Sequence, residues 1–487
     1  MVAGPFAGSG SGTGLGHAVV IGASMAGLLA ARALTDHVER VTVIERDALP
    51  AGAEHRTGVP QGRQLHILLA RGRQVIEGFF PGYREQLLAA GAVPVQVPAD
   101  VLVLGPAGLL DRRATGWEAL SASRLLVEAS VRSRLRELPG ITFLERHEVT
   151  GLVASRDGRG VRGVEVRSRD AGSGGSADLE AELVVDASGR GSRAAAWLAG
   201  LGYPGAALSE VDPNIAYASR MYRIPDGFSA DWRAVMLSSQ PPSMPRTGYL
   251  FPIEGGRWMV SMVGTAGQHP PTDDDGWRAF ARSLRSPVIA DALAGAEPLA
   301  PVRGHRGTAN RQWHVERMAR WPERFVVLGD AVCAFNPVYG QGMSTAAVAA
   351  ETLDGCLAEH LRDHSGTDLD GLAVRFQRRL ARRNASPWTL STGEDLRFPT
   401  TTGMRAGPVL RAQHRYLDRL ALAATTDTAV AEAYLRVVGM LDEPTVLFRP
   451  RVLVSALRPA REQGVRRRRP PSSSSRPVPD PRPPEDP

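Results

Sequence analysis

The sequence contains no lysine, and all 58 basic residues among its 487 are arginines. The formal net charge is +7, but the segment 466–487 holds six arginines against three acidic residues and accounts for much of this excess. Elsewhere, basic and acidic residues are interleaved along the chain. Because a nucleic-acid-binding surface needs a basic patch or stripe, the sequence predicts no nucleic-acid partner.

Cysteine is also scarce, since only Cys333 and Cys356 are present. Two cysteines in so long a chain provide neither a disulfide framework nor the ligand spacing of a metal site, so no metal is expected. No run approaches the about 20 apolar residues that a transmembrane helix needs. The first residues lack the basic start and apolar core of a signal peptide. These absences together predict a cytoplasmic protein without a transmembrane segment.

The patterns that are present predict an α/β protein with a Rossmann-like domain. Residues 17–47 have the pattern of a strand, a tight turn, a helix and a second strand. Residues 206–310 change to alternating strands between Pro and Gly turns, which predicts an inserted antiparallel-sheet domain for substrate. The Rossmann-like domain is therefore discontinuous, and we expect it to comprise 16–205 and 311–360.

The remaining segments differ from these two domains in composition. We expect a helical C-terminal region over 361–465. The Gly/Ser-rich start, residues 1–15, and the Arg/Pro/Ser-rich end, residues 466–487, are typical of disordered chain.

The first motif with a chemical meaning is Gly-Ala-Ser-Met-Ala-Gly at residues 22–27, between a strand and a helix. Gly22 allows the tight bend, Gly27 allows the helix to pack closely, and the helix N-terminus offers free N–H groups to a pyrophosphate. Ser24 stands where such motifs usually have a second glycine. Glu45 ends the next strand, where a carboxylate can bind ribose hydroxyls. The motif predicts dinucleotide binding but does not separate FAD from NAD.

Two later motifs also follow buried strands. Residues 184–193, Val-Val-Asp-Ala-Ser-Gly-Arg-Gly-Ser-Arg, are typical of a strand end where the backbone passes close to a ligand or simply turns. Residues 326–331 end in Gly-Asp-Ala, and Asp330 is placed to accept hydrogen bonds from sugar-like hydroxyls. Gly340 and Gly342 follow and allow the backbone to lie against a flat ring.

The order of these three motifs resembles that of the para-hydroxybenzoate hydroxylase-like flavoproteins, over residues 17 to about 355. The resemblance implies FAD as the cofactor, O2 and a small hydrophobic compound as substrates, and NAD(P)H or a separate reductase as the electron source. It implies that Gly22, Ser24, Met25 and Ala26 line the pyrophosphate. It also implies that Glu45 binds the adenosine ribose and that Asp330 binds the ribityl chain. The cofactor-binding residues implied in full are Gly22, Ser24, Met25, Ala26, Gly27, Glu45, Arg46, Arg124, Val149, Asp330, Gly340, Gly342 and Met343.

A narrower resemblance links several segments to the bacterial polyether-pathway epoxidases, which are squalene-epoxidase-like enzymes of antibiotic biosynthesis. The segments are VTVIERDALP, HRTGVPQGRQLHILLARG, YASRMYRIP, YLFPIEGGRWMVSMVGT and LGDAVCAFNPVYGQGMS. Gln341 departs from the pattern, since those epoxidases have His there. The resemblance implies insertion of one oxygen atom of O2 through a flavin C4a-hydroperoxide, with epoxidation of polyketide alkenes as the leading reaction.

Other functions remain open from the residues alone. Aromatic hydroxylation is the second choice, and a geranylgeranyl-reductase-like flavin reductase has similar motifs. The Trp-x-Trp motif of flavin halogenases is absent. An NAD-dependent dehydrogenase would account for the first motif and give no role to the Gly-Asp segment. A non-catalytic nucleotide-binding protein would bind the nucleotide without turnover. No catalytic base is identified: His66 is a candidate for a residue near the flavin, and a structural histidine is the alternative.

Overall fold

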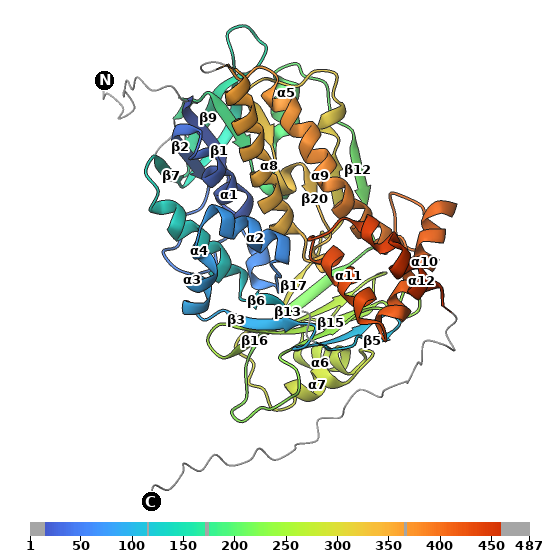
Figure 1. The fold of residues 1–487 in the computed structure, drawn as a ribbon. Helices are drawn as coiled ribbons and strands as arrows, with labels where there is room; N and C mark the ends of the chain where they lie inside the picture. Colours follow the sequence, from blue (N-terminus) through green and yellow to red (C-terminus); the bar gives the residue numbers. More distant parts are fainter. Residues whose placement is uncertain (1–14, 114–115, 171–174, 365–367, 459–487) are drawn as a thin grey trace, which may run out of the picture.

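A five-stranded parallel sheet forms the centre of the N-terminal part of the protein (Figure 1). The computed structural model describes residues 15–113, 116–170, 175–364 and 368–458. The sheet has the order β19-β11-β1-β2-β7. Parallel strands covered on both faces need continuous apolar runs, and all of β11 except its final Asp186 is apolar and buried. The strands are β1 (Leu15–Ile21), β2 (Val38–Glu45), β7 (Ile141–Glu145), β11 (Leu183–Asp186) and β19 (Phe325–Val327).

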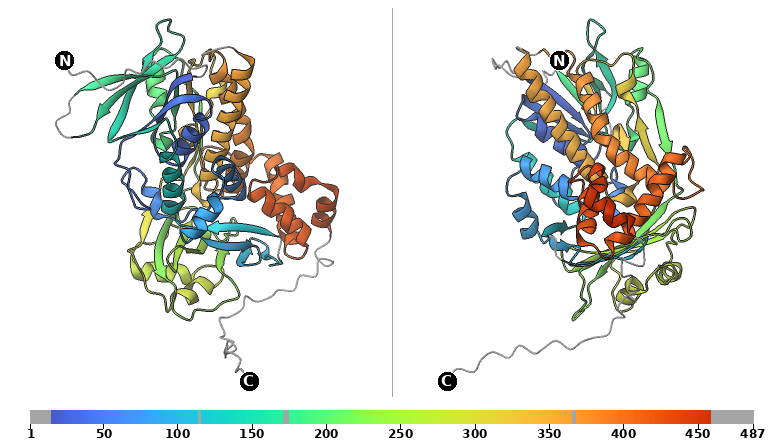
Figure 2. Two further views of the ribbon diagram at one scale, coloured as in Figure 1. Left: turned by 60° about the vertical axis from the view of Figure 1, so that its left-hand side comes forward. Right: turned by 45° about the vertical axis from the view of Figure 1, so that its right-hand side comes forward.

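Helices and a smaller sheet enclose this parallel sheet. In the left view of Figure 2, the long helix α8 and the three-stranded antiparallel sheet lie on opposite sides of it. The helices that share a hydrophobic core with the parallel sheet are α1 (Met25–Leu34), α2 (Ala70–Phe79), α3 (Tyr83–Ala89), α4 (Arg124–Arg136), α5 (Ala194–Gly200), α8 (Gly342–Asp363) and α9 (Leu372–Asp395). The smaller sheet contains β8 (His147–Ala154), β9 (Val161–Ser168) and β10 (Ser176–Glu180).

A seven-stranded sheet in the order β17-β13-β16-β15-β14-β4-β5 forms the lower part of the molecule in Figure 1. Trp258, Val260 and Met262 of β16 pack with Trp277 and Phe280 of α6 in one hydrophobic core. The elements are β4 (Val101–Gly105), β5 (Gly108–Leu109), β13 (Ala216–Arg223), β14 (Ala234–Leu237), β15 (Arg246–Ile253), β16 (Arg257–Gly264), β17 (Arg303–His305), α6 (Asp274–Arg282) and α7 (Val288–Leu293).

This sheet extends beyond the segment 206–310 that we expected to form the inserted domain. Strands β13 to β17 come from that segment, but β4 and β5 belong to the part of the chain assigned above to the Rossmann-like domain. β4 joins by parallel pairing with β14, for example Leu102 opposite Val235. A pairing between strands so far apart in sequence leaves no local signal.

The C-terminal region is helical, as expected from its sequence. Its helices are α9 (Leu372–Asp395), α10 (Pro408–Ala424), α11 (Thr428–Val438) and α12 (Pro450–Leu457). Strand β1 starts at Leu15, one residue inside the segment expected to be disordered; residues 1–14 and 466–487 lie outside the described residues. No helix among the described residues is long and apolar enough to cross a membrane.

Short elements complete the described chain. Two further sheets pair β3 with β6 and arrange β12, β18 and β20 side by side. Their strands are β3 (Val93–Val97), β6 (Trp117–Ser121), β12 (Leu208–Val211), β18 (Asn310–Trp313) and β20 (Cys333–Ala334). The 3-10 helices are η1 (Pro60–Arg63), η2 (Gly189–Gly191), η3 (Val315–Arg317), η4 (Gly329–Ala331), η5 (Pro337–Tyr339) and η6 (Pro444–Phe448).

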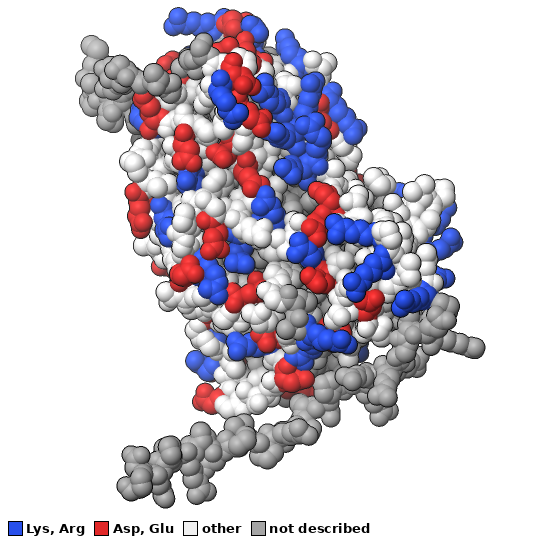
Figure 3. Space-filling model, in the orientation of Figure 1, with Lys and Arg blue, Asp and Glu red and all other residues white. Residues whose placement is uncertain are grey.

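Charged side chains of both signs are interspersed over most of the face shown in Figure 3. The densest group of basic side chains lies at the upper right, in the region of α9. The exposed arginines of this helix include Arg378, Arg382 and Arg383. We interpret this group of arginines as the solvent-exposed face of α9.

Candidate active site

The three motifs meet at the carboxyl ends of β1, β11 and β19. The N–H of Ala187 donates to the carbonyl of Ile21 (3.0 Å), and the N–H of Leu328 donates to the carbonyl of Asp186 (3.0 Å). A Cβ atom on Gly329, whose φ is +63°, would lie 2.8 Å from the Cβ of Ala26. The first and third motifs are therefore in direct contact, at the edge of a parallel sheet where ligands usually bind.

A cavity of about 530 Å³ opens at this edge. All but one of the residues predicted to bind the cofactor line it: Gly22, Ser24, Met25, Ala26, Glu45, Arg46, Arg124, Val149, Asp330, Gly340, Gly342 and Met343. Gly27 is the exception, because it faces the turn and a Cβ there would lie 1.8 Å from the carbonyl oxygen of Gly22. Gly27 therefore allows the close helix packing expected from the motif and does not line the cavity.

Several lining residues were not singled out from the sequence. They include Arg190 and Arg193 of the second motif, and also Arg56, His147, Trp197 and His305, which come from segments with no motif of their own. Arg56 and His66 both lie in the segment HRTGVPQGRQLHILLARG, whose resemblance to the epoxidases was the only signal for this part of the wall. The basic residues give the cavity a positive wall that suits an anionic ligand group.

Arg56 is held between two buried carboxylates. Its Nη1 lies 2.9 Å from Glu45 Oε2, and its Nη2 lies 3.1 Å from Glu128 Oε1. Burial acts to lower the pKa of Arg56, but the two carboxylates outweigh burial and raise it above its ordinary value. Glu45 also accepts the N–H of Ala23 (2.9 Å), so the acid at the end of β2 orients the first motif.

Arg124, the first residue of α4, reaches the same cluster from the other side. Its Nη2 donates to Ser24 Oγ (2.6 Å) and to Glu128 Oε2 (3.3 Å). Burial acts to raise the pKa of Glu128, but Arg124 and Arg56 together hold it below its ordinary value. Ser24 stands where such motifs usually have glycine, and its hydroxyl links the dinucleotide turn to α4.

His66 lies beside Arg124 and faces the cavity. Its Nδ1 lies 3.0 Å from the carbonyl of Gln64, so Nδ1 holds the proton and donates. Its Nε2 lies 3.3 Å from Arg124 Nη1 and accepts. Burial, and then the charge of Arg124, lower the pKa of His66 to about 3. The imidazole is therefore neutral at physiological pH.

The acids of the second and third motifs have different surroundings. Asp186 is fully buried and accepts from Ser188 N–H (2.9 Å) and from Ser192 Oγ (2.6 Å), so it shapes the turn. Asp330 lines the cavity, with its Oδ2 3.9 Å from Arg190 Nε. Burial raises the pKa of both carboxyls. No residue in the described part of the chain donates a hydrogen bond to the Asp330 carboxyl, which is therefore suited to receive ligand hydroxyls.

The loop after Asp330 closes one end of the cavity against the seven-stranded sheet. Gly340 has a φ of +66°, and the 22-residue helix α8 begins at Gly342. An apolar cluster adjoins this end, in which Phe251 and Tyr249 of β15 pack with Ile67. Strand β15 therefore has one face on the core with α6 and the other face toward the loop beside the cavity.

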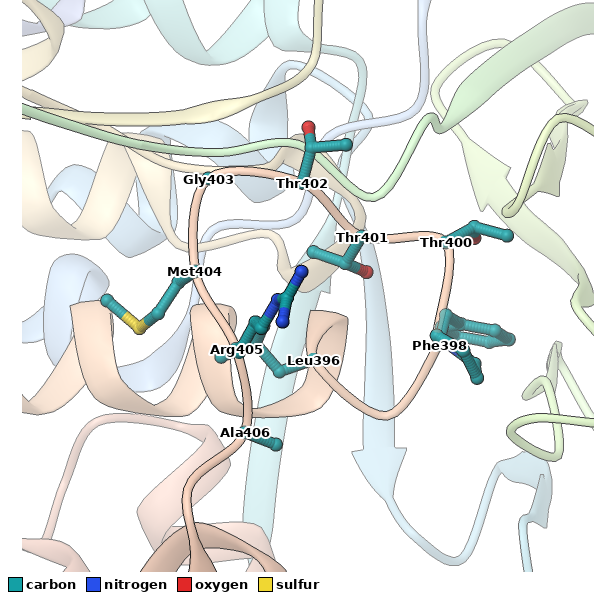
Figure 4. A pocket seen from close by; sticks show the side chains of 10 residues that line it. Leu396, Phe398, Thr400, Thr401, Thr402, Gly403, Met404, Arg405 and Ala406 are labelled. Atoms are coloured by element: carbon teal, nitrogen blue, oxygen red, sulfur yellow. The ribbon is translucent and has the colours of Figure 1, made fainter.

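A second cavity, of about 790 Å³, is lined by one continuous loop, residues 396–406 (Figure 4). Its wall consists of Leu396 and of residues 398–406, and it includes no part of the three motifs. Arg405 is the charged side chain in this lining. The chemistry expected from the sequence therefore lies in the smaller cavity.

The three-motif cavity fits FAD on observations independent of any bound molecule. The Nε of Arg124 is buried without a hydrogen-bond partner, which leaves a donor for an anionic ligand. The N-terminal residues of α1 and α8 both line the cavity, so two helix N-termini offer N–H groups to negative charge. Residues Gly22 to Ala26 and Glu45 would hold the nucleotide half, while Asp330 and Gly340 would hold the flavin half.

The sequence matches the model of a family described as an FAD binding domain over residues 17–371. The chain belongs to this family. It is also 35% identical over 466 residues to Protein Rv3254 of Mycobacterium tuberculosis, covering 93% of this chain and 96% of that protein. The family membership makes FAD the cofactor and the chain a flavoenzyme.

Solved structures share the fold of this FAD-binding chain. The flavin-dependent brominase Bmp2 superposes with a TM-score of 0.62 at 15% identity, covering 91% of this chain and 98% of that one. The p-nitrophenol 4-monooxygenase PnpA from Pseudomonas putida DLL-E4 has a TM-score of 0.59 at 18% identity, covering 88% and 99%. These likenesses show that the whole α/β arrangement is that of flavin-dependent enzymes.

Proposed function

We propose that the protein is an FAD-dependent monooxygenase that inserts one oxygen atom of O2 into a hydrophobic natural product. Bound FAD, once reduced, supplies the activation of O2. The chain's part is to bind and orient the flavin, to seat the substrate beside it and to exclude water. The observation that carries this proposal is the junction of the polar cofactor cavity with an apolar cluster at the flavin end.

The apolar cluster indicates the substrate class. Ile67 lines the cavity and packs with Tyr249, Phe251 and Met236 of the seven-stranded sheet. Tyr249 is half-buried against this cluster, and burial raises the pKa of its hydroxyl. A surface of this kind favours an apolar, extended molecule over a charged one.

Epoxidation of a polyketide-type alkene is the reaction we favour. Phenol hydroxylation benefits from a base that removes the ring proton, whereas epoxidation of an alkene needs none. Three histidines line the cavity. His66 has a pKa of about 3 and burial lowers the pKa of His305, so these two imidazoles are poor bases. The third, His147, has its Nδ1 2.6 Å from the carbonyl oxygen of Glu145. Aromatic hydroxylation is the second candidate, favoured by the likeness in fold to p-nitrophenol 4-monooxygenase.

The experiment that tests the proposal begins with the absorption spectrum of the protein with FAD, before and after NADPH is added in air. Bleaching followed by oxygen-dependent recovery indicates direct reduction by NADPH, and bleaching only with an added reductase indicates a partner. The protein is then supplied with labelled ¹⁸O2 and two probes, a linear polyene and a phenol. A labelled epoxide supports the proposal. A labelled phenol product alone overturns epoxidation, and absence of FAD binding overturns the whole proposal.

A further inference from the structure

Asp395 ends helix α9 and is 1% exposed, yet it lies outside the lining of the cofactor cavity. Its carboxylate meets side chains from two other segments. Asn310 Nδ2 donates to Oδ2 (2.6 Å), and Tyr339 Oη donates to Oδ1 (2.7 Å). Asn336 Nδ2 lies 3.1 Å from Oδ1 and 3.2 Å from Oδ2. The carboxylate therefore ties β18 and the loop after Asp330 to the end of α9.

The orientation of both amides is fixed by other hydrogen bonds. Asn310 Oδ1 accepts from the N–H of Asn336 (2.8 Å) and from Ser391 Oγ (2.6 Å), so its Nδ2 must face Asp395. Asn336 Oδ1 accepts from the N–H of Val338 (3.2 Å), so its Nδ2 must also face Asp395. The two amides and the Tyr339 hydroxyl all direct donors at the carboxylate, which can accept them at both of its oxygens.

A buried acid without a cationic partner is costly to keep. Among the described residues, Arg397 is the nearest arginine in sequence to Asp395, and its ion pairs are with Glu394 and Asp418. Burial raises the pKa of Asp395 to about 7, against the opposing effect of its three donors. Fully hydrogen-bonded polar networks of this kind rigidify the part of the protein that they join.

The loop that Asp395 holds is part of the cavity wall. Phe335, Pro337, Gly340 and Gly342 line the cavity, while Asn336 and Tyr339 between them turn away to Asp395. Gly340 adopts its positive φ directly after Tyr339. Fixing Asn336 and Tyr339 therefore fixes the residues that face the ligand on either side of them.

We propose that Asp395 is a positioning residue that sets the geometry of the loop Asn336–Gln341 against the flavin end of the cavity. The inference rests on the proposed function, because it takes FAD to be the ligand of that cavity. Asp395 acts through the loop and touches neither cofactor nor substrate. An amide in place of the carboxylate has a single acceptor atom, so the donors on one side lose their acceptor and one side of the loop is released.

The test compares Asp395→Asn and Tyr339→Phe with the control Asp427→Asn. Asp427 caps helix α11 by accepting from the N–H of Ala429 (3.0 Å), and it lies outside the cavity lining. Three quantities are measured: hydrogen exchange of the amides of residues 336–342 in the FAD-free protein, the Kd for FAD, and the visible spectrum of the bound flavin. Tyr339→Phe removes a single hydroxyl and keeps the test decisive where Asp395→Asn does not fold.

We expect both loop variants to speed exchange in 336–342, to weaken FAD binding about tenfold and to shift the flavin bands. Asp427→Asn should change none of the three, because Asn caps a helix N-terminus about as well as Asp. Unchanged exchange in both loop variants, or faster exchange with wild-type affinity and spectrum, overturns the inference. Wild-type protein that fails to bind FAD overturns the proposed function, while the exchange measurement still decides whether Asp395 anchors the loop.

Discussion

A Cβ atom on Gly27 would lie 1.8 Å from the carbonyl oxygen of Gly22. The first turn of α1 therefore packs on the backbone of the turn that leaves β1, with no room for a methyl group. Gly22 itself has a φ of +99°, and a Cβ there would lie 2.9 Å from the carbonyl oxygen of Ala187. The two glycines thus have separate purposes, one for the turn and one for the helix.

Gly27→Ala is expected to destabilise the protein by about 1–3 kcal/mol or more, because the contact is with backbone and neither partner can rotate away. It should also weaken FAD binding, since α1 can no longer reach its position. The measurement is urea unfolding together with FAD titration. The control is Gly78→Ala, at a helical glycine with no neighbouring atom within 4 Å of the added Cβ. Equal stability of the two variants would contradict the packing role.

Arg56 supports a second prediction, because it separates two buried carboxylates. Arg56→Met should cost about 3–5 kcal/mol of unfolding free energy, since Glu45 and Glu128 are left buried without this cation. Adding Glu128→Gln to Arg56→Met should recover part of the loss by removing one of the two carboxylates that lose this cation. Arg223→Ala, which breaks an exposed ion pair with Glu297, is the control and should leave unfolding unchanged. If Arg56→Met lowered the unfolding free energy as little as Arg223→Ala, the stabilising role of Arg56 between the two carboxylates would be contradicted.

The positions found from the sequence and those missed have different physical origins. Gly22, Glu45 and Asp330 follow strands whose apolar runs are visible locally, so their place at one sheet edge follows from parallel topology. Arg56 and His305 reach the cavity from segments without a periodic pattern. Their approach depends on contacts between distant parts of the chain, which a single sequence does not display.

The same reasoning explains why the sequence did not reveal the pairing of β4 with β14 or the contacts of Asp395. The pairing of β4 with β14 joins residues about 130 positions apart, and neither strand shows a local signal of its partner. Asp395 appeared in the sequence as one more acid in a long helix rich in charge. Its role is visible only once Asn310 and Asn336 are in place around it.

Binding of FAD should raise the melting temperature of the protein. Because the cavity joins β1, β2, β11 and β19, the ligand binds the folded state alone and stabilises it by mass action. At a free FAD concentration 100 times its Kd, the gain is about 2.7 kcal/mol. Removal of FAD by dialysis should reverse the shift, and NAD at the same concentration serves as the control ligand. A larger shift with NAD would overturn the assignment of the cavity to FAD.

The pH dependence of stability provides the last test, through His66. Its pKa is about 3 in the folded protein and has the ordinary value of 6.5 when the chain unfolds. Between these values the unfolded chain binds a proton that the folded protein excludes, so His66 lowers stability as the pH falls below 6.5.

In the His66→Gln variant this penalty is absent. Relative to wild type, the FAD-free variant should therefore gain about 2 kcal/mol of unfolding free energy between pH 7 and pH 5. Urea unfolding of both proteins at the two pH values measures the double difference, in which the other histidines cancel. A difference that does not change with pH would mean that His66 takes up a proton between pH 7 and pH 5 in the folded protein as readily as in the unfolded chain. Its Nε2 would then no longer accept from Arg124, and the argument for a cavity without a protonated imidazole would fail.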